Sequence, residues 1–533
     1  MNRRRALALA SGVIAAATGC GLTVPAPRQG GQGASVSASS TGSDATSTLT
    51  ESSPVSGGAS AAEVGAVGSG GTVSGGGTVS SGGAPPAYGG GGTVSSDRTS
   101  SAGRRPVTPV RTSKATGADA IPVSGQGWDS KYIYIGQTTQ NDGDTVLSSS
   151  GSNLSTGCQQ CDGQAIADAI NRAGGLFGRQ IKIYTHDTSV AKGEQDPAGS
   201  AQGNCVAFTQ DQKVVSAVTV GALDSDDYRQ CMATHHTIDF SLAPVPWDDQ
   251  EAKRFAPYYY NIDYYGLDQF LPTFLRRLTA QHYFTGWDAI NGQPSATNPV
   301  KLGVLYGTDP TSSRQGPAFI ASLQKAGYPA EGFQSGLASS SDASAAVLRF
   351  EADRVTHVLS IDTSALFFSV AAQSQHYRPR LAISSHEGLI LWDGAVQPSQ
   401  LAGAVGVGWF PAADVPQASD PGVLGGQQWC YDALKADGQN VQSSRLAEAL
   451  GLAICDGIRL TVEAARAGGG LDPASIRVGI TKIGTAFPAS AAGMGLSGIS
   501  ASVFGLPGGA RDIVFDSGCS CLKYVGATYR VPS

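Results

Sequence analysis

Apolar runs and helix-like segments alternate along the chain from residue 131 onward. The run Tyr132–Gly136 gives way to a polar loop, and residues 164–173 then place alanine and isoleucine on one helical face. A glycine-rich turn at 174–179 and a second apolar run, Ile181–Tyr184, follow. Strand, helix, turn and strand in this order predict a βαβ unit with parallel strands.

The same alternation recurs as far as residue 384. Further predicted strands are Val214–Val220, Ile238–Leu242, Lys301–Tyr306, His357–Ile361 and Arg380–Ser384, and the predicted helices include Ala318–Lys325 and Leu366–Gln375. Such a succession predicts an α/β fold with doubly wound parallel sheets.

One part of this pattern matches a known family. The segment Ala169–Arg179, followed by Tyr184 and Asp187, resembles the signature of type I periplasmic binding proteins. The leucine/isoleucine/valine-binding proteins are the most similar members, and the resemblance covers roughly residues 131–529. It implies two doubly wound parallel-sheet lobes that are joined by three hinge crossings and hold a ligand between them.

The resemblance also implies a division of the chain. We expect a bilobal solute-binding domain at 128–533. The first lobe would take about 131–263 and 412–482, and the second about 264–411 and 483–533. About 400 residues is a suitable size for one such bilobal unit.

The first twenty residues have the pattern of an export signal. Arg3–Arg5 precede the apolar run Ala6–Ala17, which is too short to span a membrane, and Thr18 and Gly19 then precede Cys20. Small residues before a cysteine allow lipid attachment to its thiol, so we expect a signal peptide at 1–19 and lipidation, such as palmitoylation, of Cys20. An ordinary signal peptide with an incidental Cys20 is the alternative. Both the general and the twin-arginine export routes stay open.

Residues 20–127 are rich in glycine, serine, threonine, alanine and proline. The unit Gly-Gly-Thr-Val-Ser occurs at 70–74, 76–80 and 91–95. Such a segment has too little apolar surface to form a core, which predicts a disordered, flexible tether with a span of roughly 55–60 Å. A glycosylated or wall-embedded segment is the alternative.

Net charge and composition limit the classes of molecule that the protein is expected to bind. The 533 residues carry a formal net charge of −6, and only 15% of them are charged. No basic block follows the signal, so nucleic-acid binding is not expected. No later apolar run is long enough to span a bilayer. We therefore expect a monomer on the extracytoplasmic side of the cell envelope, held to the membrane by its lipid anchor.

Eight cysteines remain when Cys20 is set aside, and an even number in an exported chain predicts disulfides. The resemblance implies a Cys205–Cys231 bridge, and the order of elements in the fold favours Cys430–Cys455 between neighbouring helices. Cys158 and Cys161 are expected to close a small loop, with a redox pair as the alternative. Cys519 and Cys521 would form a tight ring or pair elsewhere. No cysteine or histidine spacing of a zinc finger occurs, so no metal is expected.

Catalytic motifs are absent from the sequence. There is no Gly-x-Ser-x-Gly elbow, no His-Glu-x-x-His and no phosphate-binding loop. We therefore expect a protein that is not an enzyme and needs no cofactor.

Two loops after first-lobe strands are candidate ligand loops, because ligands of parallel sheets bind beyond the carboxyl ends of the strands. The resemblance implies that Ser225 holds a ligand carboxylate, yet Asp224 and its acidic neighbours would repel one. Helix capping by Asp224 or Ser225 is the alternative. Ala243 and Val245 fall in the next loop, where relatives carry a hydroxyl that Val245 replaces.

Candidates in the second lobe and the hinge complete the predicted site. Glu387 aligns with the family's acid that binds an ammonium group, and His386 could add a hydrogen bond. Asp362 and Thr363 follow the strand 357–361, and are implied to form another ligand loop. Asp263 and Tyr264 fall at the first crossing between the lobes, where hinge packing is the alternative.

These features together predict an extracytoplasmic binding protein that closes around a small polar ligand. The ligand is expected to bear an amine, as an amino acid or amide does, and to pass to an ABC transporter permease. A membrane-tethered receptor or sensor of the same fold, without transport, is the alternative.

Overall fold

The computed structural model describes residues 121–149, 153–221, 225–336 and 340–532. The predicted signal peptide, Cys20, nearly all of the predicted tether and Asp224 lie outside the described residues. All the described residues fall within one compact unit of the chain.

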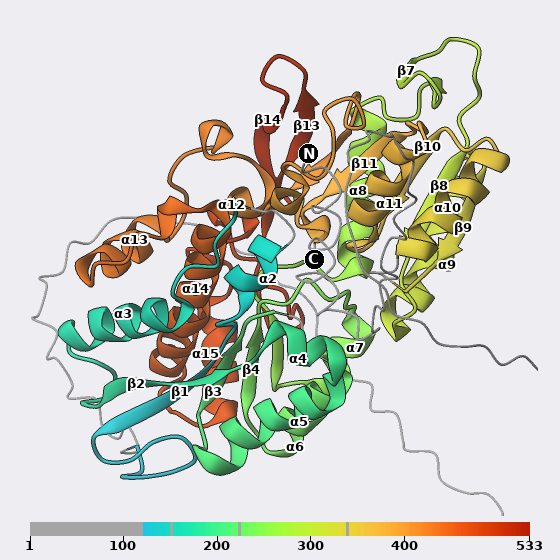
Figure 1. Ribbon diagram of the computed structural model, residues 1–533. Helices are drawn as coiled ribbons and strands as arrows, with labels where there is room; N and C mark the ends of the chain where they lie inside the picture. The colour runs from blue at the N-terminus through green and yellow to red at the C-terminus, as the bar shows by residue number, and fades with distance from the viewer. Residues whose placement is uncertain (1–120, 150–152, 222–224, 337–339, 533) are drawn as a thin grey trace, which may run out of the picture. The chain divides into compact units, whose positions relative to one another are not determined.

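The first sheet has five parallel strands in the order β2-β1-β3-β4-β5 within the described ranges. Its strands are β1 (Tyr132–Thr139), β2 (Gln180–Asp187), β3 (Ser216–Thr219), β4 (Ile238–Ser241) and β5 (Tyr259–Asn261). Helices α3 (Gln159–Arg172), α14 (Arg445–Gly468) and α15 (Pro473–Ile483) lie on one side of this sheet, and α5 (Pro197–Val206) and α6 (Asp226–Thr234) lie on the other (Figure 1). Both faces are thus covered, as the continuous apolar runs of its strands require.

The glycine turn that gave the family resemblance ends α3 (Gln159–Arg172) and starts β2. Gly175 has a φ of +67°, and a Cβ there would lie 2.1 Å from the carbonyl oxygen of Arg179. Only glycine fits this close turn. The turn therefore sets the direction in which β2 pairs with β1.

The second sheet has the order β14-β13-β12-β11-β10-β8-β9 in the described part of the chain. Its strands are β8 (Leu302–Tyr306), β9 (Ala330–Gln334), β10 (His357–Ser360), β11 (Arg380–Ser384), β12 (Val405–Gly408), β13 (Gly509–Asp516) and β14 (Cys521–Arg530). The strands from β12 to β9 are parallel, as predicted, whereas β13 and β14 form an antiparallel hairpin at the edge. A short turn can join only antiparallel neighbours.

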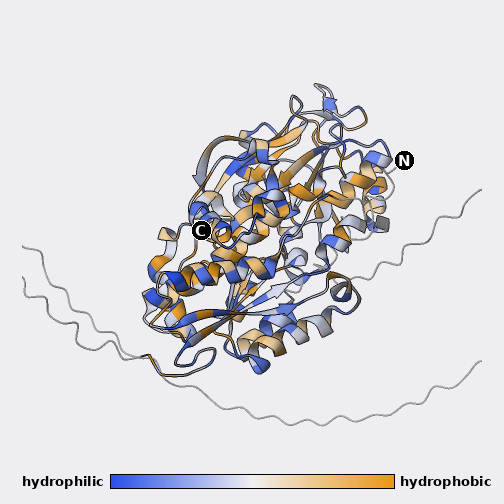
Figure 2. Ribbon diagram, turned by 60° about the vertical axis from the view of Figure 1, so that its left-hand side comes forward, coloured by the Kyte–Doolittle hydropathy of each residue, from blue (hydrophilic) through white to orange (hydrophobic). Residues whose placement is uncertain are grey.

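The helices connect and cover these strands. They are α2 (Gly143–Ser149), α4 (Val190–Gln195), α5 (Pro197–Val206), α6 (Asp226–Thr234), α7 (Asp249–Phe255), α8 (Leu267–Ala280), α9 (Pro310–Lys325), α10 (Ser340–Ala352), α11 (Ser364–Ser374), α12 (Pro411–Asp414), α13 (Gln427–Ala436), α14 (Arg445–Gly468) and α15 (Pro473–Ile483). A small hairpin, β6 (Trp287–Asp288) and β7 (Gln293–Pro294), stands apart from both sheets. Figure 2 shows apolar residues concentrated in the strands, with polar residues along much of the outer helix surface.

We call each sheet with its covering helices a lobe. Within the described ranges the chain passes between the lobes three times: after β5, after β12 and before β13. The first and third crossings are hydrogen-bonded, because the N–H of Asn261 donates to the carbonyl of Phe504 at 3.0 Å and the N–H of Leu506 donates to the carbonyl of Asn261 at 2.9 Å. The Trp409 indole of the second crossing donates to the carbonyl of Asp263 at 2.9 Å. The predicted lobe boundaries, which depend on where each crossing is cut, stay a prediction.

The described residues contain four disulfides, which pair all eight cysteines considered above: Cys158–Cys161, Cys205–Cys231, Cys430–Cys455 and Cys519–Cys521. The two favoured pairings are therefore present, joining α5 to α6 and α13 to α14. Cys519 and Cys521 pair with each other at the turn between β13 and β14. Over the ranges given above, no helix has the length and apolar character that crossing a membrane would need.

Candidate functional site

A pocket of about 110 Å³ lies where the two lobes and the crossings meet. Loops that follow β1, β3 and β4 line it from the first lobe, and loops that follow β10 and β11 line it from the second. Its polar lining residues are Gln140, Thr156, Asp263, Tyr264, Thr363 and Glu387. Most of the other lining side chains are apolar, namely Val220, Leu242, Pro244, Ile390, Leu391, Phe410, Ala413, Leu446, Ala449 and Leu450. This is the position at which open α/β sheets bind ligands.

Glu387 reaches the pocket from the short helical turn Ser385–Glu387 that follows β11. Its side chain is fully buried, and neither carboxylate oxygen has a hydrogen-bond partner among the described residues. Burial raises the pKa of Glu387 well above its usual range, and the neighbouring carboxyl groups of Asp362 and Asp414 raise it further. A buried carboxylate without a partner is costly, so this group is suited to meet a cation or a hydrogen-bond donor.

Asp263 reaches the pocket from the first crossing, directly after β5. It is 2% exposed, and its Oδ1 atom has no hydrogen-bond partner in the described structure. Burial raises the pKa of Asp263 well above its usual range, with a smaller contribution from Asp456 on α14. A second acid without a cationic partner therefore faces the same space as Glu387.

Tyr264 and His386 join the hinge to the second lobe. Tyr264 lines the pocket, and its ring stacks on that of His386 with centroids 5.7 Å apart. Phe270 and Trp409 also pack on His386, at 5.1 and 5.0 Å. Burial lowers the pKa of His386 to about 3, so the imidazole is neutral. His386 does not line the pocket and adds no positive charge beside Glu387.

Two further predicted residues follow β10. Thr363 lines the pocket, and its hydroxyl has no partner among the residues described. Asp362 lies behind it and accepts a hydrogen bond from the N–H of Ser364 at 2.8 Å. Burial raises the pKa of Asp362 to about 6. Asp362 therefore acts on the pocket through its charge, whereas Thr363 offers a hydroxyl.

The predicted first-lobe residues are placed differently. The hydroxyl of Ser225 caps α6, where it accepts a hydrogen bond from the N–H of Tyr228 at 3.3 Å. Ala243 and Val245 do not line the pocket, although their neighbours Leu242 and Pro244 do.

Sequence reasoning missed Gln140, Thr156 and the α14 residues Leu446, Ala449 and Leu450. Gln140 directly follows β1, so the strand-end rule could have found it. Thr156 lies in a Ser/Gly-rich loop that carries no pattern. The missed residues supply most of the first-lobe side of the pocket.

Asp414 supports the pocket from the second crossing. Its Oδ2 atom accepts hydrogen bonds from the hydroxyl of Ser385 at 2.6 Å, from the N–H of Phe410 at 3.0 Å and from the hydroxyl of Tyr524. Burial raises its pKa to about 6. Asp414 thereby fixes the turn that carries Glu387 and adds another carboxyl group nearby.

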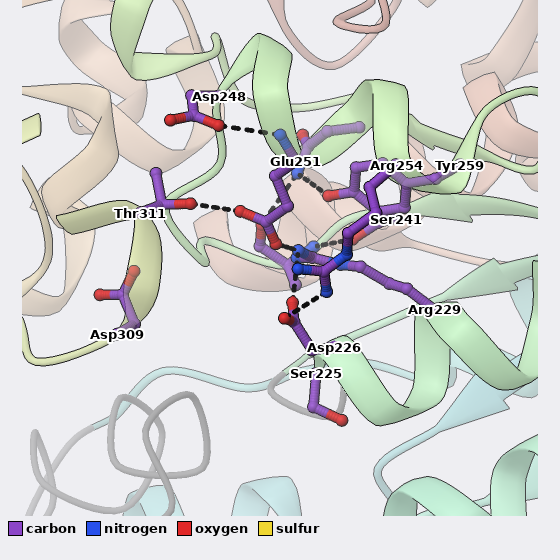
Figure 3. Close-up of polar contacts among 12 residues, drawn as sticks. Ser225, Asp226, Arg229, Ser241, Asp248, Glu251, Arg254, Tyr259, Asp309 and Thr311 are labelled. Carbon is purple, nitrogen blue, oxygen red and sulfur yellow. Dashed lines mark hydrogen bonds and ion pairs between the residues drawn. The ribbon is translucent and has the colours of Figure 1, made fainter. Parts of the chain in front are cut away.

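A second polar group, which we call the rim cluster, links α7 of the first lobe to α9 of the second. It consists of Arg229, Asp248, Glu251 and Thr311, which Figure 3 labels, together with Arg314. Glu251 accepts hydrogen bonds from Arg229 and from the hydroxyl of Thr311, and Arg314 contacts Asp248 at 3.0 Å. Asp248 and Glu251 belong to the first lobe, whereas Thr311 and Arg314 belong to the second.

The charged lining residues of the pocket, as far as the structure describes them, are Asp263 and Glu387. Across the described ranges no group of three or more histidine, cysteine, aspartate or glutamate side chains could hold a metal ion. The arrangement can therefore bind a small molecule through charge, hydrogen bonds and apolar contact.

Comparisons with known proteins give the fold a family context. No family model and no curated protein match the chain. Among solved structures, an ABC transporter substrate-binding protein from Aeropyrum pernix is similar at a TM-score of 0.54 and 12% identity, over 76% of this chain and 97% of that one. A solute-binding protein of an R. palustris ABC transporter, in complex with 4-hydroxybenzoate, has a TM-score of 0.52 and 12% identity over 75% and 98% of the two chains.

A possible leucine/isoleucine/valine-binding protein from Rhodopirellula baltica SH 1 has a TM-score of 0.51 and 14% identity, over 76% of this chain and 98% of that one. Each similarity extends over nearly the whole length of the solved structure. At such low identity it establishes the fold alone. The described chain therefore has the bilobal fold of the type I periplasmic binding proteins, as its glycine turn predicted.

Proposed function

We propose that this protein is an extracytoplasmic solute-binding protein that holds a small molecule in the pocket between its lobes. The observation that carries the proposal is Glu387, a fully buried carboxyl group whose two oxygens lack partners among the described residues. A side chain in this state is expensive to keep in an apolar site unless a ligand pairs with it. Solved structures of the same fold include substrate-binding proteins of ABC transporters, which supports this role.

The pocket is lined by residues from both lobes, which suggests how the protein would bind its ligand. Leu242 and Leu446 come from the first lobe, Asp263 from a crossing, and Glu387 from the second lobe. A ligand can touch all of them only when the lobes are together. Binding therefore selects the closed state, and the hydrogen-bonded crossings act as the hinge.

The proposed ligand is small, partly polar and amine-bearing, such as an amino acid or amide. An ammonium group would form charge-assisted hydrogen bonds with Glu387. The closed protein would then deliver this ligand to an ABC permease. We further propose that the protein acts as a monomer and that a lipid on Cys20 holds it at the outer side of the membrane.

Native mass spectrometry and thermal-shift screening of the purified full chain test this function. We expect a retained small-molecule adduct, or a melting temperature that rises with the concentration of one class among amines, amino acids, amides and sugars. Absence of both an adduct and any shift across this panel contradicts the proposal.

A variant that fills the pocket tests whether the thermal shift comes from binding in the pocket or from binding elsewhere on the protein. Ala449→Phe places a large side chain in the pocket lining, whereas Ala321→Phe changes an exposed position on α9. Ala449→Phe should abolish the thermal shift, and Ala321→Phe should keep it. Equal shifts in the two variants would place the ligand elsewhere.

A further inference from the structure

We infer that the ligand of the interlobe pocket is a small apolar amine that carries no carboxylate. This inference rests on the proposed solute-binding function and narrows its ligand class to amines other than amino acids. The ammonium group would lie against Glu387, and the hydrocarbon body would contact apolar residues of both lobes.

The ionisable groups in and around the pocket are predominantly acidic. Its charged lining residues, among those described, are the acids Asp263 and Glu387. Further acids act on them as well, because Asp362 and Asp414 raise the pKa of Glu387 and Asp456 raises the pKa of Asp263. A cation placed here would favour the ionised forms of these acids and be attracted by them, whereas an anion would gain no opposite charge from the described lining residues.

Nearby arginines are already occupied. Arg445 contacts Glu448 at 2.5 Å and Asp420 at 2.8 Å. At the rim, Arg314 contacts Asp248 at 3.0 Å. A ligand carboxylate would therefore enter an apolar, acidic space without a basic side chain to pair with it, which is a costly arrangement.

The hydroxyl groups expected to hold a carboxylate are also engaged. Ser225 caps α6 and does not line the pocket. Thr156 does line the pocket, but its hydroxyl donates to Asp144 at 2.7 Å. Gln140 and Thr363 provide neutral hydrogen-bonding groups on the pocket wall. These groups suit a hydroxyl or amide on the ligand better than a full negative charge.

The remaining walls fit a short hydrocarbon. Leu242 and Leu450 line the pocket from the first lobe, and Ile390 and Leu391 line it from the second. The pocket volume, about 110 Å³, is well below the roughly 300–1,000 Å³ of pockets that take drug-sized ligands. An amine of a few carbon atoms therefore matches both the lining and the size.

Four compounds with one branched carbon skeleton test the inference by calorimetry on the full chain. Isopentylamine carries only the amine, leucine adds a carboxylate, 4-methylpentanoic acid carries only the carboxylate, and isopentanol is neutral. The affinity for isopentylamine should exceed that for leucine by about tenfold or more, because the carboxylate of leucine would lie in the site without a cationic partner. The acid should give no measurable binding.

A variant that removes the charge of Glu387 tests whether this residue pairs with the ammonium group of the ligand. Glu387→Gln should weaken isopentylamine binding by about ten- to a hundredfold, because a charge-assisted contact is lost. Glu351→Gln on α10 is the matched control at an exposed position and should bind as the wild type does. An unchanged affinity of Glu387→Gln would overturn the inference.

Binding of the four compounds to the wild-type protein tests the inferred ligand class apart from the proposed function. This test does not require that Glu387→Gln folds. If leucine, the acid or the alcohol binds as tightly as the amine, solute binding stands and the inferred ligand class is wrong. If none of the four compounds binds, the inference is also wrong. The proposed function is then decided by the adduct and pocket-filling experiments above.

Discussion

Asp248 and Arg314 form an ion pair of 3.0 Å between the two lobes. Asp248 also caps α7 by accepting a hydrogen bond from the N–H of Glu251 at 2.9 Å, and it is 2% exposed. Gln315, the next residue on α9, donates to the same carboxylate at 3.0 Å. The buried carboxylate thus couples the start of a first-lobe helix to a helix of the second lobe.

This contact predicts a remote effect on ligand affinity. Arg314→Ala removes the cation that pairs with Asp248 and should destabilise the closed state, so ligand affinity should fall by about three- to thirtyfold although no pocket residue has changed. Calorimetry with the ligand identified by screening measures this change.

Arg254→Ala is the matched control. Arg254 pairs with Asp226 inside the first lobe and is largely exposed. Its loss should leave affinity nearly unchanged. Equal losses for the two variants would show that the pair between Asp248 and Arg314 has no special part in closure.

The buried acids predict a stability that falls as pH rises from about 4 to about 7. Burial raises the pKa of Asp162 from 3.8 to about 7 and that of Asp362 and Asp414 to about 6. Between its unfolded and folded pKa values each such group keeps a proton that the unfolded chain has released, so it costs about 1.4 kcal/mol per pH unit up to its own folded pKa. Urea unfolding at pH 5 and pH 7.5 should give the higher midpoint at pH 5.

Asp162→Asn isolates one of these groups, because its amide cannot ionise. The variant should show a smaller loss of stability between the two pH values than the wild type. A wild-type midpoint that is flat or rises with pH would contradict this account.

A close helix–sheet contact predicts opposite outcomes for two glycine substitutions. On α14, a Cβ at Gly457 would lie 2.7 Å from a methyl carbon of Val218 on β3. Gly457→Ala should therefore lower the free energy of unfolding by about 1–3 kcal/mol. On α5, a Cβ at Gly203 would have no neighbour within 4 Å, so Gly203→Ala should raise it by about 0.5–1 kcal/mol. Denaturant unfolding distinguishes them, and two changes of the same sign would refute the packing argument.

The disulfides should contribute unequally to stability. Cys430 and Cys455 are 25 residues apart, so their bond removes much freedom from the unfolded chain. Replacing both with alanine should cost about 3–4 kcal/mol. Cys519 and Cys521 are 2 residues apart, and their replacement should cost much less. Denaturant unfolding of the two double variants compares them directly, and similar losses would contradict the loop-length explanation.

Most parallel strands could be predicted from sequence because they are short apolar runs between glycine or polar turns. The predicted runs 132–136, 181–184 and 301–306 coincide with observed strands, apart from shifts at their ends. β5 was not predicted, since its three residues give no periodicity. The hairpin β13–β14 mixes apolar with charged and small residues, and the second half of β14 is mostly exposed, which weakens its signal.

The site was accessible to sequence reasoning only where residues directly follow a strand. Thr363, Asp263 and Glu387 follow β10, β5 and β11, and all three line one pocket. Ser225 caps α6 and Val245 does not line this pocket, so their part in ligand binding stays a prediction. The contribution of α14 could not be foreseen, since it comes from tertiary packing across a long stretch of chain.

Because α14 packs on α3 and β3, the first lobe is built from two stretches that are separated by the parallel strands of the second lobe. A chain synthesised from its N-terminus thus makes α3 long before the helix that covers it. Until residue 468 has been made, the buried face of α3, with Ile166 and Ile170, has no partner from α14. Synthesis of the first lobe begins before that of the second, but the first lobe cannot complete its folding first. This order favours a growing chain that stays unfolded until its synthesis is nearly complete.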